Sequence, residues 1–342
     1  MKVSVVILNW NGCDMLRTFL PSVVRYSEGE GIEVCVADNG STDGSVSLLQ
    51  QEFPSVRTII LDRNYGFADG YNVALRQVDA EYVVLLNSDV EVTDHWLEPM
   101  IAYLDKHPEV AACQPKIRSQ RQKEYFEYAG AAGGFIDKYG YPFCRGRIMG
   151  VVEKDESQYD TVIPVFWATG AALFIRRADY VNVGGLDGRF FAHMEEIDLC
   201  WRLRSRNREI VCIPQSIVYH VGGATLKKEN PHKTFLNFRN NLVMLYKNLP
   251  QEELNKVMRI RTCLDYLAAF NFLLQGHWDN ASAVMRARKE YKRLCPSFSL
   301  SREENMRKKT LNPIPERTKS SILWQFYVRG CKRFSQLSDL KG

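Results

Sequence analysis

The sequence predicts an α/β fold, in which a Rossmann-like, mostly parallel sheet has helices on both faces and is followed by a helical C-terminal extension. Three observations predict this class. Strand-like runs alternate with helix-like segments through the first 115 residues, each run ends in a polar cluster, and the pattern becomes helical from Lys233 onward. Right-handed connections between successive strands give such a sheet its parallel order.

Composition narrows the class of protein. The chain has 342 residues, 45% of them hydrophobic, so it can bury a large core. Its formal charge of +5 is too small to indicate nucleic-acid binding, which we do not expect. The nine cysteines form no C-x-x-C pair and Met1 leads almost directly into a strand, so we expect reduced thiols and a cytoplasmic protein. No run reaches the roughly 20 apolar residues of a membrane span.

The first half can be divided into elements in order. The run Tyr82–Leu86 is apolar throughout, which is typical of a strand buried on both faces. Clusters of Gly, Asn, Asp and Ser separate the elements, because these residues turn the chain and cap helix N-termini. The expected strands are 3–8, 32–37, 56–61 and 82–86, and the expected helices are 14–26, 45–52, 64–78 and 96–106.

The middle of the chain is less regular. We expect short strands at 110–114, 162–167, 171–175, 210–213 and 217–219, and a helix within 190–206. The pattern is then helical to the end. This division predicts a first domain at residues 1–245, with halves at 1–115 and 116–245, and a helical C-terminal region at 246–342.

Polar clusters at four strand ends indicate a ligand site. In a doubly wound sheet, the loops after the strands lie along one edge, so their side chains should converge. Oxygen-rich groups at that edge suit a hard divalent cation such as Mg²⁺ or Mn²⁺. One such cluster alone is an ordinary turn, but four together favour a site. The clusters are Asn9 to Asn11, Asp38 to Asp43, Asn64 to Asn72 and Asn87 to Asp89.

These segments resemble the pattern of glycosyltransferase family 2, in its rhamnosyltransferase-like bacterial branch. The resemblance covers roughly residues 1–245, and the ordered set is far more specific than any single motif. It implies a GT-A fold, a nucleotide-sugar donor, a divalent metal (Mg²⁺ or Mn²⁺) and inversion at the anomeric carbon. The matching segments are Ile7-Leu-Asn-Trp-Asn11, Val36-Ala-Asp-Asn-Gly-Ser-Thr-Asp-Gly-Ser45, Asn64-Tyr-Gly-Phe-Ala-Asp-Gly-Tyr-Asn72, Leu85-Leu-Asn-Ser-Asp-Val90, Val183-Gly-Gly-Leu-Asp187, Phe190-Phe191, Glu195-Glu-Ile-Asp-Leu-Cys200 and Tyr219-His220.

The resemblance makes residues 1–115 the nucleotide-sugar half. Asp38, at the end of the second strand, would accept hydrogen bonds from the base or ribose. Gly66 permits close backbone approach to the donor. Asn72 would contact the donor, with a structural hydrogen bond as the alternative. The full expected donor-binding set is Asn9, Trp10, Asp38, Asn64, Gly66, Asn72, Asn87 and Ser88.

The metal site is expected at Asn87-Ser-Asp89, which stands where the family has its D-x-D motif. Asp89 is therefore the expected metal ligand. Asn87 replaces the first Asp, which leaves one fewer anionic ligand, and is expected to touch the nucleotide sugar. His220 resembles the C-terminal histidine that completes the metal site in the family.

Sugar transfer also needs a base to take the proton of the acceptor hydroxyl. Aligning Glu195-Glu-Ile-Asp-Leu199 with the E-D-x-D-L motif of the family places Glu196 at the usual catalytic Asp, with Glu195 as the competing base. Arg202, Arg204 and Arg206 are expected to form surface pairs.

Residues 116–245 would form the acceptor half. Trp167, Thr169 and Gly170 resemble the small-residue stretch that lies below the acceptor in the family, and we place Asp198 with them, orienting the helix or an arginine.

The C-terminal region is basic. Residues 276–342 contain 15 Lys/Arg against 6 Asp/Glu. The apolar segment Leu264–Leu274 has three interpretations: it packs against the catalytic body, it lies on the inner membrane face as a peripheral contact, or it joins two copies in a homodimer.

The sequence thus predicts an inverting, metal-dependent glycosyltransferase that acts on a growing cell-surface polysaccharide or a lipid-linked (polyprenyl) glycan. One alternative is a nucleotidyltransferase, although no Gly-rich, Lys-containing phosphate loop follows the first strand. The other is a catalytically degenerate scaffold for glycan assembly, since Asn87 and Glu196 depart from the family pattern.

Overall fold

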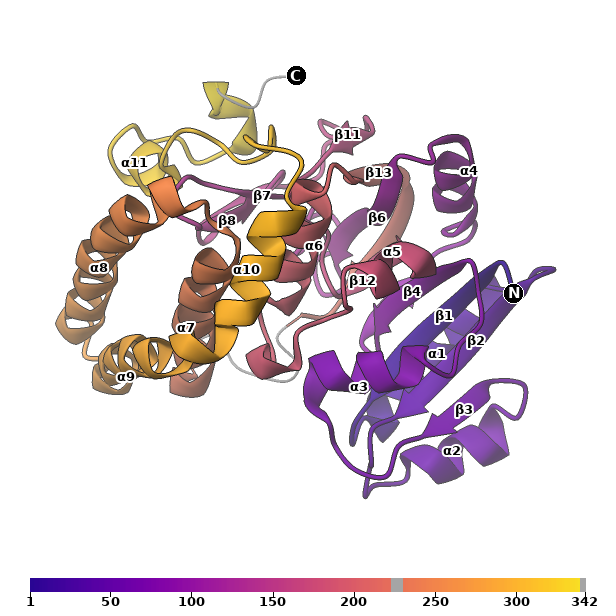
Figure 1. Ribbon diagram of the computed structural model, residues 1–342. Helices are drawn as coiled ribbons and strands as arrows, with labels where there is room; N and C mark the ends of the chain where they lie inside the picture. The colour runs from indigo at the N-terminus through magenta and orange to yellow at the C-terminus, as the bar shows by residue number, and fades with distance from the viewer. Residues whose placement is uncertain (223–229, 339–342) are drawn as a thin grey trace.

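The computed structural model describes residues 1–222 and 230–338, which form a central sheet, a small second sheet and a helical C-terminal layer (Figure 1). The strands are β1 (Val3–Asn9), β2 (Ile32–Asp38), β3 (Arg57–Ile60), β4 (Tyr82–Asn87), β5 (Val90–Val92), β6 (Val110–Ser119), β7 (Gly134–Ile136), β8 (Pro142–Cys144), β9 (Arg147–Ile148), β10 (Val151–Val152), β11 (Ile163–Pro164), β12 (Ala172–Arg176) and β13 (Glu209–His220). The α-helices are α1 (Cys13–Tyr26), α2 (Ser45–Glu52), α3 (Gly66–Leu75), α4 (Glu98–Lys106), α5 (Arg177–Asn182), α6 (Glu195–Ser205), α7 (Pro231–Asn248), α8 (Gln251–Leu274), α9 (Trp278–Leu294), α10 (Ser299–Lys308) and α11 (Ile322–Tyr327). Three short 3₁₀ turns lie at Gly188–Phe190, Cys295–Phe298 and Phe334–Gln336.

The central sheet confirms the α/β class. Its strand order is β11-β13-β6-β12-β4-β1-β2-β3, with β5 paired to β13. The run β4-β1-β2-β3 is parallel, as expected for the first half. The second half is mixed, because β12 runs antiparallel to both β4 and β6. The parallel part of the sheet therefore ends at β4, the strand whose last residue is Asn87, because its other neighbour, β12, is antiparallel.

Strand β4 is buried on both faces because its side chains alternate between two cores. Val84 and Leu86 point into the cluster formed with α1, α2 and α4. Val83 and Leu85 point into the cluster formed with α3, α6 and the C-terminal helices. Every residue from Tyr82 to Leu86 is at most 1% exposed, which explains why the segment is apolar throughout.

Several expected boundaries are wrong for physical reasons. The strands expected at 210–213 and 217–219 are one strand, β13, whose pairing with β6 shifts register between Ile213 and Ile217. The helix expected within residues 190–206 is confirmed as α6, which begins only at Glu195 because Phe191, His193 and Met194 have positive φ angles that are incompatible with a helix. After α10 the chain is mostly irregular, with α11 its only α-helix within the described residues, so the expectation of helix to the end is also wrong.

The C-terminal region packs onto the sheet domain. Val257, Phe326 and Phe334 belong to the same buried cluster as Val83 on β4. Position 245, the expected domain boundary, lies within α7. No helix among the described residues is both long and apolar enough to cross a membrane.

Candidate active site

The ends of β1 and β2 meet because the strands pair in parallel with Asn9 opposite Asp38. The Asn9 amide donates to Asp38 Oδ2 (3.2 Å), and the Ser41 backbone N–H donates to Asp38 Oδ1 (2.9 Å). Asp38 is only 1% exposed. Its carboxylate therefore organises the loop after β2, and each oxygen accepts one of these bonds. The contact with a base or ribose that the sequence predicts for Asp38 stays a prediction.

Two other groups lie at this edge, Asn9 Oδ1, which is buried, and Trp10, which is exposed. Asn9 Oδ1 has no hydrogen-bond partner, and Gly12 leaves space beside it, since a Cβ there would lie 2.4 Å from that oxygen. The same Cβ would lie 3.8 Å from Ser88 Oγ, so the ends of β1 and β4 adjoin. Trp10 is 53% exposed beside them.

Asn39, which is not among the residues predicted from the sequence, joins two of these loops. Its amide donates to Asn64 Oδ1 (3.1 Å) and to the Gly66 carbonyl (3.0 Å), and its Oδ1 accepts from the Tyr65 backbone N–H. Asn64 Oδ1 also accepts from the Gly66 N–H. Asn64 thus builds the loop, while Gly66 has φ +76° and lies so close to Phe191 that a Cβ would be 3.3 Å from its ring.

Asn72 is a structural residue in this arrangement, as the alternative interpretation held. Its Oδ1 accepts from the Tyr180 hydroxyl (2.7 Å) and the Leu186 N–H (3.1 Å), and its amide donates to the Leu186 carbonyl (2.7 Å). These bonds join α3 to the Gly184-Gly185 turn. The expected donor contact of Asn72 is corrected, because its polar atoms are already occupied.

The structure brings Asp89 and His220 together at the carboxyl end of β4. Strand β5 pairs antiparallel with β13, with Val90 opposite His220, which sets the histidine beside Asp89. His220 Nε2 lies 3.1 Å from Asp89 Oδ1 and 3.4 Å from the Asn87 amide nitrogen. Both Asp89 and His220 are buried. Sequence neighbours alone could not have shown this contact, which depends on the sheet.

These atoms fit a divalent cation. The 3.1 Å separation of Asp89 Oδ1 and His220 Nε2 is that of an ion pair, and both side chains are ligand types for divalent cations: a carboxylate oxygen suits Mg²⁺ or Mn²⁺, and imidazole is the commonest metal ligand among side chains. Within the described part of the chain, no group of three or more His, Cys, Asp or Glu side chains could hold a metal. A cation here would therefore take its other ligands from substrate phosphates and water, as Mg²⁺ commonly does.

Glu127 lies behind His220, and no sequence motif predicts this position. Its Oε2 lies 3.6 Å from His220 Nδ1 and accepts a hydrogen bond from the Ala129 N–H (2.6 Å). Gly222, at φ +65°, makes room, since a Cβ there would be 2.5 Å from Glu127 Oε1. A carboxylate on the far nitrogen of a histidine fixes the ring and makes the near nitrogen a better ligand.

In this cluster, His220 and the carboxylates of Asp89 and Glu127 stabilise one another's charged forms. Burial alone would lower the pKa of His220, but Asp89 and Glu127 outweigh it and raise that pKa to about 10. Burial would raise the pKa of Asp89, but the hydrogen bond and charge of His220 lower it below its usual value. Asp89 is therefore an anion at neutral pH.

Glu195 and Glu196 form a second cluster at the start of α6. One oxygen of each, Oε2, is buried without a hydrogen-bond partner, as is His193 Nε2. Burial, and then the charge of Glu196, raise the pKa of Glu195 well above its usual value; burial also raises the pKa of Glu196. Buried carboxylates with raised pKa values are typical of general bases.

The chain before α6 is strained and is held by α7. Phe191, His193 and Met194 have φ angles between 67° and 74°. The Asn240 amide of α7 donates to the carbonyls of Phe190, Ala192 and His193 at 2.8–2.9 Å. Asn240 therefore fixes the backbone that aims Glu195 and Glu196.

The expected acceptor residues divide into two groups. A Cβ on Gly170 would lie 3.8 Å from the Glu196 Cβ and 3.3 Å from the Phe67 ring, so Gly170 adjoins the carboxylate cluster. Trp167 does not: it is 3% exposed and donates to the Phe135 carbonyl (2.9 Å). Thr169 is buried and accepts from the Ala171 N–H. Trp167 and Thr169 are corrected to core residues, since neither presents a surface to a sugar.

Asp198 is fully buried in an ion-pair network, where it orients Arg202 as expected; its grouping with the acceptor residues is corrected, since it presents no surface to a sugar. It binds Arg202 (2.9 Å), Lys247 (2.8 Å) and the Asn248 amide (2.8 Å). Arg202 and Arg204 are likewise buried and paired, Arg204 with Glu316, so the surface pairs expected for them are wrong.

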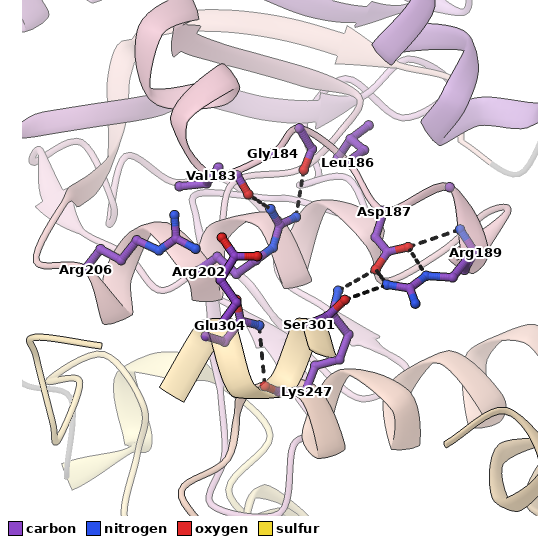
Figure 2. A pocket seen from close by; sticks show the side chains of 13 residues that line it. Val183, Gly184, Leu186, Asp187, Arg189, Arg202, Arg206, Lys247, Ser301 and Glu304 are labelled. Carbon is purple, nitrogen blue, oxygen red and sulfur yellow. Dashed lines mark hydrogen bonds and ion pairs between the residues drawn. The ribbon is translucent and has the colours of Figure 1, made fainter. Parts of the chain in front are cut away.

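A cavity of about 280 Å³ borders this network (Figure 2). Figure 2 shows Asp187 held by Arg189. Lys247 donates to Asp187 (2.7 Å) and also to Asp198 (2.8 Å), which is not among the side chains drawn there. Arg202 donates to the carbonyls of Val183 and Gly185. Each of these charged side chains pairs with another group of the protein. The cavity wall therefore joins α6, α7 and the Gly184-Gly185 turn, and it supports Glu195 and Glu196 at the start of α6.

Comparison with known proteins agrees with this geometry. The family model described as Glycosyl transferase family 2 matches residues 4–176. The N-acetylglucosaminyl-diphospho-decaprenol L-rhamnosyltransferase of Mycobacterium tuberculosis is 27% identical over 230 residues, covering 63% of this chain and 75% of that protein.

Solved structures share the GT-A fold. GalNAc-T7, determined with UDP, GalNAc and Mn²⁺, superposes with a TM-score of 0.58 at 14% identity, over 93% of this chain and 59% of that one. Staphylococcus aureus TarS residues 1–349, in complex with UDP-GlcNAc, gives 0.55 at 15% identity, over 90% of this chain and 89% of that one.

Proposed function

The chain belongs to glycosyltransferase family 2, and from that premise we propose that it transfers one sugar from a nucleotide-sugar donor to a lipid-linked glycan, in a metal-dependent reaction that inverts the anomeric carbon. The observation that carries the proposal is the pairing of Asp89 with His220 at the carboxyl end of β4. The rhamnosyltransferase of M. tuberculosis supports a lipid-linked acceptor, because its name specifies a diphospho-decaprenol.

Asp89 and His220 would hold Mg²⁺ or Mn²⁺, a choice supported by the Mn²⁺ in the GalNAc-T7 structure. Asn87, beside His220, would contact the donor. When bound, such a cation neutralises charge that develops on a diphosphate leaving group. Glu127 would orient His220 from behind.

Glu196 would act as the base, with Glu195 as its neighbour. The acceptor hydroxyl attacks the anomeric carbon on the face opposite the diphosphate. A C–O bond to the acceptor forms, the C–O bond to the diphosphate breaks with its electron pair, and the hydroxyl proton goes to Glu196. Attack from the opposite face inverts the centre. A raised pKa makes Glu196 a stronger proton acceptor than an exposed glutamate.

The donor side would be formed by Asn9 Oδ1, Trp10, Ser88 and the backbone at Gly66. Asp38 and Asn64 would also fix the loops that carry these groups. Family membership supports glycosyl transfer over nucleotidyl transfer. Rhamnose is the first sugar to test, since the mycobacterial relative is an L-rhamnosyltransferase.

A donor panel tests the proposal. UDP-, dTDP- and GDP-sugars are screened for thermal stabilisation of the protein with Mn²⁺, and the best donors are then assayed for release of the nucleoside diphosphate. We expect one donor class to stabilise the protein and to be turned over. Binding without release from any donor, with and without a polyprenyl-diphosphate glycan, would indicate a non-catalytic scaffold.

A further inference from the structure

Helix α8 has its polar and apolar faces inverted with respect to an ordinary surface helix, which buries apolar side chains and exposes charged ones. Its inward face carries Arg261 and Asp265, both fully buried. Arg261 and Arg288 of α9 both pair with Asp265. An ion-pair network therefore fixes this part of α8 to α9, next to a small apolar contact around Ala269.

The outward face of the same segment is apolar. We call it the outer stripe, and its residues follow one another at helical spacing, with the last at the start of α9. Their side chains are between 47% and 72% exposed. The outer stripe consists of Tyr266, Leu267, Phe270, Leu274 and Trp278.

Within residues 1–222 and 230–338, the outer stripe is left largely open. The Arg288 guanidinium lies 5.5 Å from the centre of the Tyr266 ring, and the other four side chains are 57–72% exposed. Figure 1 shows α8 at the outer edge of the helical layer, on the side away from β1, β2 and β3. The first interpretation of the sequence, in which Leu264–Leu274 packs against the catalytic body, therefore holds only for its inner side, where Ala269, Phe272 and Leu273 meet α9. A contiguous exposed set of large apolar side chains marks an interaction surface.

The charges around the outer stripe indicate the partner. Among the charged residues of α8 and α9 that are exposed, basic ones predominate. The basic residues are Lys256, Arg259, Arg286, Lys289, Lys292 and Arg293, and the acidic ones are Glu252 and Asp279. Aromatic and aliphatic side chains flanked by Lys and Arg suit the interface of an anionic bilayer. A symmetric dimer through the same face would bring two basic flanks together, which disfavours a second copy.

We propose that the outer stripe of α8 and Trp278 bind the surface of an anionic lipid bilayer, with the helix lying in the interface. The inference rests on the proposed function in one respect: a lipid-linked acceptor would be presented at that surface. α8 would lie on the membrane and not cross it, since charged side chains interrupt its apolar residues and its inner face is occupied by Arg261 and Asp265.

Vesicle sedimentation of the full chain tests the inference. Vesicles of phosphatidylglycerol and phosphatidylcholine are compared with phosphatidylcholine alone, at low and high ionic strength. Wild type should bind the anionic vesicles and lose binding as salt rises. The double variant Leu267→Gln/Leu274→Gln should bind roughly tenfold more weakly or worse, because two leucines no longer enter the bilayer.

The matched control is Leu300→Gln, which alters a leucine of α10 that is 77% exposed and lies outside the outer stripe. It should bind as wild type does. Equal binding by the double variant, or no binding by wild type, overturns the inference. The inference is also overturned if the wild type binds no vesicles but forms a concentration-dependent dimer, seen by light scattering, that the double variant does not form.

Two further measurements keep the result clear. Brominated lipids should quench the fluorescence of wild type more than that of Trp278→Phe; equal quenching counts against the inference and does not depend on the folding of the double variant. Donor binding is measured in the same preparations. If no donor binds, the proposed function is refuted. If donors bind but vesicles do not, only the inference about the outer stripe is refuted.

Discussion

Replacing Glu127 by glutamine should weaken the binding of Mn²⁺ by roughly tenfold to a hundredfold. The substitution keeps the size of the side chain and leaves an oxygen to accept from the Ala129 N–H, but it removes the negative charge 3.6 Å from His220 Nδ1. Between full unit charges at that separation, the attraction is about 4–5 kcal/mol at an effective dielectric constant of 20. An imidazole bound to a metal carries only part of a charge, so about 1.4–2.7 kcal/mol is the expected loss, in line with such outer carboxylates elsewhere.

The assay is a titration of Mn²⁺ in the presence of UDP, with free Mn²⁺ followed by electron paramagnetic resonance. Glu124→Gln, which neutralises an exposed glutamate three residues away, is the control and should bind as wild type does. If Glu127→Gln binds Mn²⁺ with unchanged affinity while Asp89→Asn does not, the orienting role of Glu127 is wrong but the metal site stands. If neither variant changes the affinity, the cation binds elsewhere.

Two other substitutions probe the cluster at the start of α6. Glu195→Gln should stabilise the protein above neutral pH: burial raises the pKa of Glu195, so its charged form is disfavoured in the folded state and stability falls as pH rises from the ordinary value of 4.5 towards the folded-state pKa. Thermal unfolding should show a Tm higher by a few degrees at pH 8 and an unchanged Tm at pH 4; the same shift at both pH values would contradict this cause. Asn240→Ala should lower kcat roughly 10²-fold with little change in donor affinity, because the carbonyls of residues 190–193 lose their common donor. Asn255→Ala, an exposed asparagine of α8, is the control, and equal kcat values for the two variants would refute the role of Asn240.

The sequence predicted the sheet where the pattern was local. An unbroken apolar run such as Tyr82–Leu86 occurs where both faces are buried, and α2 has the predicted bounds of 45–52. The sequence failed where tertiary contacts decide. β13 continues past Ile213 because β6 extends beside it, and the start of α6 is delayed by a strained segment that Asn240 holds from another helix.

The candidate site divides in the same way. Asp89 and His220 could be selected from their motifs, but their contact depends on the pairing of β5 with β13. Glu127 has no motif and lies in an irregular region, and its position requires the positive φ of Gly222. Asp198 was expected to orient the helix or an arginine, and its place on the helix turns it towards Arg202 and Lys247. Glu195 and Asp198 are both buried, so it is the ion-pair partners of Asp198 that give it a separate role, and these partners are not visible in a linear pattern.

The most direct test of the central claim compares Glu196→Gln with Asp89→Ala, using the donor selected by the panel, Mn²⁺ and a polyprenyl-diphosphate glycan. Product formation and the configuration of the new linkage are measured by NMR, and donor binding by calorimetry. The account predicts an inverted product from wild type, no product from either variant, and donor binding retained by Glu196→Gln but weakened in Asp89→Ala. Full turnover by Glu196→Gln, or a retained anomeric configuration, would contradict it.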